Sequence, residues 1–181
     1  MNPEMHADGK PIRRGRLALR LGIAAAASCI GQMAYAATIT ATGPMTISAT
    51  VASSCTIGAS TLAFGSATSA AITAGNIDAI GTVTVNCTSG SAYSVALDAG
   101  AGTGATVAIR KMSAGPQLLS YSIYTSAART TVWGDGTAAS VPVAGTGNGT
   151  SQTISAYGRV FAGQIVTATT YADTVNVTIT Y

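Results

Sequence analysis

The sequence predicts an all-β fold, built as a β-sandwich. Apolar and polar residues alternate with a period of two over several short stretches, which is typical of strands that bury one face. Segments rich in glycine and serine, such as 99–104 and 144–151, separate these stretches. The alanine-rich residues 67–74 carry no capped amphipathic pattern, so we expect no helix there. Repeated short strands joined by turns favour two packed sheets.

The first 36 residues are typical of a secretory signal peptide. Arginines at positions 13, 14, 16 and 20 form a basic region, and the apolar stretch over 17–30 is too short to span a membrane stably. Residues 34–36 (Ala-Tyr-Ala) have the small-x-small pattern of a cleavage site. We therefore expect cleavage before Ala37, an N-terminal extension over 37–50 and a sandwich domain over 51–181, exported from the cytoplasm with no stable membrane insertion.

Removal of this segment leaves residues 37–181 without net charge, because basic and acidic side chains balance. They are Arg110, Lys111, Arg129 and Arg159 against Asp78, Asp98, Asp135 and Asp173. A neutral chain has no basic surface for nucleic acid. The single histidine, His6, leaves with the signal peptide, so the mature chain has no histidine base. We predict that the protein is not an enzyme and has no catalytic residue, metal or cofactor.

Other sites remain conceivable. A pair of aspartates could serve glycoside hydrolysis, but Asp98 and Asp135 lie in glycine-flanked turns and Asp173 precedes a strand, where a structural role is usual. The glycine-rich residues 100–104 lack the lysine and the following helix of a phosphate-binding loop. Trp133 and the tyrosines could form a sugar-binding face, although packing in the core or between subunits is the simpler interpretation.

Two cysteines, Cys55 and Cys87, remain in the exported chain, and in an oxidising compartment they most simply form one disulfide. A metal or redox pair is the alternative, but the spacing is not CxxC and no histidine is left to complete a metal site. On the loop-entropy model, closing this loop would stabilise the fold by roughly 3–4 kcal/mol.

The first predicted strand covers residues 38–51, well ahead of Cys55. Its apolar side chains share one parity, while Thr and Ser mostly occupy the other. The apolar residues of this parity include Ile39, Ala41, Met45 and Ile47. Pro44 has the opposite parity, so its ring need not point inward, but it removes a hydrogen-bond donor and leaves the pairing register open.

The remaining predicted strands follow in order: 81–87, 93–97 before a turn at 98–100, 118–124, 131–133 before a turn at 134–136, 152–160 and 174–181. In the last strand Val175, Val177 and Ile179 share one face, and the chain ends at Tyr181. A sandwich that starts with a surplus strand and stops on a strand suggests that one molecule's extra strand fills another's open position. Such donation is a form of β-augmentation.

Several segments also resemble the spore coat protein U domain family, which includes the major pilins of archaic (Csu-type) chaperone–usher pili. They are residues 55–58 (CTIG), 62–65 (LAFG), 83–87 (VTVNC), 95–100 (VALDAG), 119–131 with YSIYTSAAR, 157–160 (YGRV) and 171–181 (YADTVNVTITY). The resemblance covers nearly all of the mature chain. It implies an immunoglobulin-like sandwich that lacks its final strand and is completed by a donor strand from a neighbouring subunit.

The resemblance also implies roles and partners. Ile39, Ala41, Met45 and Ile47 would be the donor side chains, Val175, Val177, Ile179 and Tyr181 would belong to the acceptor groove and C-terminal strand, and Cys55–Cys87 would match the family disulfide. The partners would be further copies of the chain, a periplasmic chaperone and an outer-membrane usher. The expected function is a structural subunit of a surface pilus or coat that supports adhesion and biofilm formation. The alternative is a secreted carbohydrate- or surface-binding module, such as a minor tip adhesin or a spore coat component.

Overall fold

A computed structural model of the chain describes residues 38–59 and 61–181. The expected signal peptide and its cleavage site lie outside these residues. Residues 38–54 form neither a strand nor a helix, and all their side chains are exposed. The predicted strand over 38–51 therefore has no partner within a single chain, and its pairing with another copy stays a prediction.

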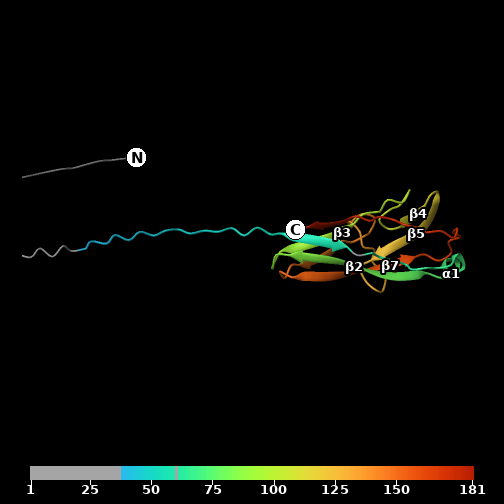
Figure 1. Ribbon diagram of the computed structural model, residues 1–181, viewed down its shortest axis with the longest axis horizontal. Coiled ribbons are helices and arrows are strands. Elements are labelled where there is room, and N and C mark those ends of the chain that lie inside the picture. The colour runs from blue at the N-terminus through green and yellow to red at the C-terminus, as the bar shows by residue number, and fades with distance from the viewer. Residues whose placement is uncertain (1–37, 60) are drawn as a thin grey trace, which may run out of the picture. The chain divides into compact units, whose positions relative to one another are not determined.

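Two antiparallel sheets form the folded domain (Figure 1). One sheet has the order β1-β2-β7-β5-β4 and the other β6-β3-β8. Their bounds are Cys55–Ala59 (β1), Ile77–Cys87 (β2), Ala92–Leu97 (β3), Arg110–Ala114 (β4), Gln117–Tyr124 (β5), Val143–Thr146 (β6), Ser151–Val160 (β7) and Val177–Thr180 (β8). This arrangement confirms the predicted all-β sandwich. β1 and β8 are both edge strands, one of each sheet.

Alternate side chains from both sheets build the core between them. β2 contributes Val83 and Val85, and β3, on the opposite sheet, contributes Val95 and Leu97. Trp133 is fully buried among them, and its indole Nε1 donates to the carbonyl of Val95 over 2.8 Å. The sugar-face interpretation of Trp133 is therefore wrong, because the ring is not accessible; the core interpretation is confirmed.

The disulfide between Cys55 and Cys87 is confirmed, with an S–S distance of 2.06 Å. The two residues are direct partners in the β1–β2 pairing, so the bond fixes the first strand at the end of the second.

In the parts of the chain that the structure describes, no helix is long and apolar enough to cross a membrane.

The prediction of no helix near 67–74 is wrong. Residues Ser69–Ala74 form α1, whose N-cap is Thr68: its hydroxyl accepts from the amide of Ala71 over 3.1 Å. Contacts distant in sequence hold this helix, because the amide of Gly163 donates to the carbonyls of Ile72 and Thr73. A six-residue helix is too short to show a hydrophobic period and is not stable by itself, so tertiary contacts decide its formation.

Candidate functional site: an open groove onto the core

A groove of about 1140 Å³ lies beyond the end of β1 and before the start of β8, the edge strands of the two sheets. One wall is the segment after β1, residues 61–69, and the other is the segment that leads into β8, residues 166–177. Neither wall carries a strand over 61–68 or 166–171. The sheets are therefore unclosed on this side.

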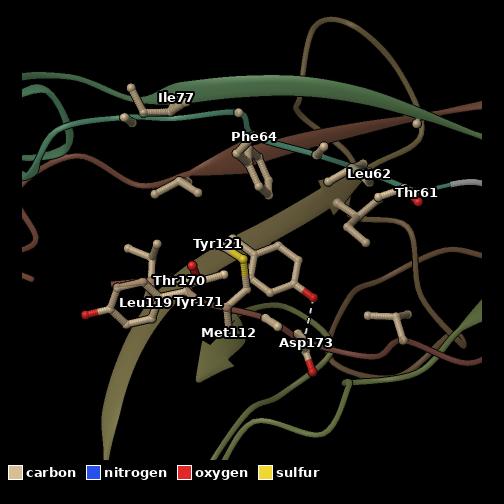
Figure 2. A pocket seen from close by; sticks show the side chains of 18 of the residues that line it. Thr61, Leu62, Phe64, Ile77, Met112, Leu119, Tyr121, Thr170, Tyr171 and Asp173 are labelled. Atoms are coloured by element: carbon tan, nitrogen blue, oxygen red, sulfur yellow. Dashed lines mark hydrogen bonds between the residues drawn. The ribbon is translucent and has the colours of Figure 1, made fainter. Parts of the chain in front are cut away.

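Alternating side chains line both walls. Leu62 and Phe64 point inward from the first wall, and Tyr171, Asp173 and Val175 from the second. Figure 2 shows Leu62 and Phe64 on one side, Tyr171 and Asp173 on the other, and the ring of Tyr121 between them. The inward residues are only half-buried, because nothing covers them from the groove side. Two half-buried rows that face one slot are what a further strand would complete.

Glycines on the sheet let the first wall lie close. A Cβ on Gly158 of β7 would come within 2.6 Å of Leu62 and 2.8 Å of Phe64, and one on Gly81 of β2 within 2.9 Å of Leu62. A side chain at either position would force Leu62 or Phe64 to shift away from the sheet. The second wall is held by Ala172, whose amide and carbonyl pair with Ser113 of β4 over 3.1 and 2.8 Å.

The floor of the groove is the hydrophobic core itself. Buried side chains from four strands and from α1 line it: Ile72, Val83, Leu97, Leu119, Tyr121, Ile123, Ala156 and Val160. Met112 of β4 adds a flexible side chain at the same site. A slot that opens onto the core offers an apolar surface for an extended chain, not a set of reactive groups.

Tyr121 is the polar exception on the floor. Its hydroxyl donates to Asp173 Oδ2 over 2.6 Å, and its ring meets that of Phe64 edge-on at 6.0 Å. Burial, the hydrogen bond and the negative charge of Asp173 all raise the pKa of Tyr121, so the phenol stays neutral. Asp173 Oδ1 also accepts from the amides of Ala101 and Thr174, both over 2.8 Å. This aspartate therefore fixes the second wall to the loop after β3, as the structural interpretation predicted.

Asp98 fixes the same wall further along. Its carboxylate accepts from the amide of Asn176 over 3.0 Å, from the side-chain amide of Asn176 over 2.6 Å and from the amide of Gly100 over 2.9 Å. Burial alone would raise the pKa of Asp98, but these hydrogen bonds outweigh it and hold the pKa below its ordinary value. Among the described residues, no three His, Cys, Asp or Glu side chains gather as a metal site would need.

The predicted groove residues fall in three different places. Val175 and Val177 line the groove, Ile179 packs against the core from the same face of β8, and Tyr181 lies at the chain end with its side chain 58% exposed. The predicted donor side chains Ile39, Met45 and Ile47 are exposed, as is Ala41. Sequence reasoning missed the first wall, although the alternation of Leu62 and Phe64 with small residues was a usable signal.

Comparison with known proteins gives a family and a fold. The model of the spore coat protein U domain family matches residues 41–178. Protein U of Myxococcus xanthus is 32% identical over 179 residues, covering 91% of this chain and 99% of that protein.

A solved structure of a pilus protein has a similar fold. A chain of the CsuC–CsuE chaperone–tip adhesion subunit pre-assembly complex, from the archaic chaperone–usher Csu pili of Acinetobacter baumannii, has a TM-score of 0.54 at 21% identity. The match covers 73% of this chain but only 40% of that one. The P pilus rod subunit PapA follows with a TM-score of 0.47 at 17% identity, over 70% of this chain and 98% of PapA.

Proposed function

Because this chain belongs to the spore coat protein U domain family, a family of structural proteins and not of enzymes, we propose that it is a subunit of a surface pilus or coat. Subunits join by donor-strand exchange, in which the N-terminal extension of one copy enters the groove of the next. A periplasmic chaperone occupies the groove before assembly, and an outer-membrane usher receives the subunit. The assembled fibre lies at the cell surface and supports adhesion and biofilm formation.

The groove is the observation that carries this proposal. Its walls are segments that form no strand over 61–68 and 166–171 and that present half-buried apolar side chains, and its floor is the core. An added strand would pair with the free edge of β8 and bury both rows at once. A small bound molecule would leave the edge of β8 unpaired, so an extended polypeptide fits better.

The N-terminal extension has the composition that this slot needs. Ile39, Met45 and Ile47 share one parity and are exposed in the single chain. Burying each would contribute about 1.5–3 kcal/mol. The gross sum is comparable to the whole stability of a small domain. A subunit with an empty groove is then marginally stable, and a filled one is very stable.

Two aspartate variants of the extension test the donor assignment. Ile47→Asp puts a charge on the face that would enter the groove, whereas Thr46→Asp puts the same charge on the opposite face and serves as the matched control. Polymers extracted from the cell surface should resist detergent without heating in the control and be lost in Ile47→Asp. Equal polymer formation by both variants would show that this parity does not enter a groove.

Electron microscopy then separates a pilus from a coat. Cells that express the chain with its chaperone and usher should carry thin fibres that disappear when residues 37–48 are deleted. A continuous layer around the cell would favour a coat. If the cell surface is the same with and without the deletion, the chain forms neither a pilus nor a coat through this segment.

A further inference from the structure

Two exposed apolar side chains lie together at the end of the domain where the chain stops. Val51 is 85% exposed and Tyr181 58% exposed, and both line a shallow hollow with residues 88–92. None of the residues in 51–54 and 88–92 is charged. Isolated exposed apolar residues are common, but two that share one uncharged hollow indicate a contact surface.

A third exposed apolar side chain lies beside the opposite end. Ile165 is 92% exposed and follows Gln164, whose carbonyl accepts from the hydroxyl of Thr73 in α1 over 3.1 Å. Figure 1 shows α1 and the C-terminus at opposite ends of the domain. Val166, the next residue, begins the second wall of the groove, so Ile165 marks the end of the groove nearest α1. Residues 162–172 carry no charge.

The direction of the donor decides which end of the groove it leaves. All strand pairings in both sheets are antiparallel, and an antiparallel addition to β8 continues that pattern. An antiparallel donor begins beside Thr180 and ends beside residues 166–171. The donor therefore leaves the groove next to Ile165.

The link between the donor and its own domain is short. Only residues 51–54 separate the extension from Cys55, the first residue of β1. Four residues span at most about 14 Å. The domain that owns the donor must then lie against the end of the groove that the donor leaves. The end that it presents is the one that carries Val51 and Tyr181.

We propose that Val51 and Tyr181 of one copy pack against Ile165 of the copy that accepts its donor strand. This inference rests on donor-strand exchange and adds a second contact between successive copies, an uncharged head-to-tail interface that sets the angle between them. Because neither surface is charged, the contact should persist at high salt.

Site-specific photo-crosslinking tests the contact in the assembled fibre. The full chain, expressed with its chaperone and usher, carries benzoylphenylalanine at position 165. Ile80 is the matched control, because it is also an isoleucine, is 62% exposed and lies within β2, outside the two surfaces of the proposed contact. Irradiation should join position 165 to residues 50–54, 88–92 or 181 of the next copy. Position 80 should give no adduct with those residues.

A second probe at position 181 examines the same contact from the other copy, and its adducts should fall near residue 165. Adducts that join the 181 probe to Tyr181 of the next copy would place the contact at the other end of the groove and overturn the proposal. Detergent-resistant polymers without adducts at either probe would overturn this contact while leaving donor-strand exchange intact. A failure of the unsubstituted chain to polymerise would overturn both.

Discussion

Arg110 brings a positive charge into the core of the sandwich. Its side chain is fully buried, and its Nε donates to the carbonyl of Asp98 over 2.8 Å. Its Nη2 donates to the carbonyls of Trp133 and Leu97 over 2.9 and 3.4 Å. Burial lowers the pKa of Arg110, although the guanidinium remains charged. One side chain thus connects β4 to the end of β3 and to the loop that holds the buried tryptophan.

Replacing Arg110 with methionine should destabilise the subunit, because three carbonyls in the interior lose their donor. Each buried acceptor left without a partner costs about 1–3 kcal/mol. Arg110→Lys should recover only part of the loss, since an ammonium group cannot reproduce the planar fork. Urea unfolding of the purified subunit measures the difference, with Lys111→Met as the control on the neighbouring, half-exposed position. Equal midpoints for the two methionine variants would contradict the role given to Arg110.

No pattern in the sequence marks Arg110 as a core residue. Its acceptors are backbone carbonyls of residues 97, 98 and 133, and these come together only when the two sheets pack. Sequence reasoning counted Arg110 as one of the balanced charges of the mature chain. A buried arginine that pairs with carboxylates can be predicted from the positions of Asp and Glu in the sequence. One that pairs with backbone carbonyls cannot, because every residue has a carbonyl.

The second groove wall keeps its position through side chains at the ends of the strands. Asp98 follows β3 directly and binds the residue before β8, so one carboxylate joins two neighbouring strands of the smaller sheet. The hydrogen bonds hold its pKa below the ordinary value. A carboxyl whose pKa is lower in the folded state stabilises the fold above its unfolded pKa, about 3.9, and that contribution is lost as pH falls through the folded value.

Acidification below about pH 4 should therefore lower the melting temperature of the subunit, and Asp98→Asn should reduce that dependence. The amide keeps an acceptor oxygen but has no charge to lose. Asp78 acts in the same direction, because Arg159 holds its carboxylate with bonds of 2.7 and 2.9 Å, and some acid sensitivity should remain. Melting curves at pH 7 and pH 3 give the comparison. A variant with the same loss as the unsubstituted chain would exclude Asp98 as a source.

Strands with clear alternation were predictable, and strands without it were not. The predicted segments 81–87, 93–97, 118–124 and 152–160 lie within β2, β3, β5 and β7. β4 (RKMSA) and β6 (VAGT) are short and show no alternation of apolar with polar residues, so only their neighbours make them strands. The predicted strand at 131–133 is reduced to isolated bridges at Val132 and Trp133.

The last predicted strand, over 174–181, is longer than the strand that the structure contains. Inward and outward residues alternate over 171–180, as the sequence indicated for 174–181, yet only Val177–Thr180 is paired as β8. The alternation reports which face meets the core, while strand pairing needs a neighbour. Residues 173–176 show the alternation of inward and outward side chains, but no strand pairs with them. They lie next to the open groove.

If a donor strand fills the open side of the sandwich, as proposed, the subunit has two levels of stability, one with the groove empty and one with it filled. A synthetic peptide of residues 38–49 should raise the melting temperature of a subunit that lacks residues 1–50. The shift should grow with peptide concentration, because a ligand that binds only the folded state stabilises it by about 2.7 kcal/mol at a hundredfold excess over Kd.

The matched control is the same peptide with serine at positions 39, 45 and 47. It keeps the length, Pro44 and the capacity for backbone hydrogen bonds, so a smaller shift isolates the contribution of the three apolar side chains. If the shortened subunit is unfolded alone, circular dichroism should show β-structure only after the native peptide is added. Equal effects of the two peptides would mean that backbone pairing alone fills the groove and that the parity of the extension carries no specificity.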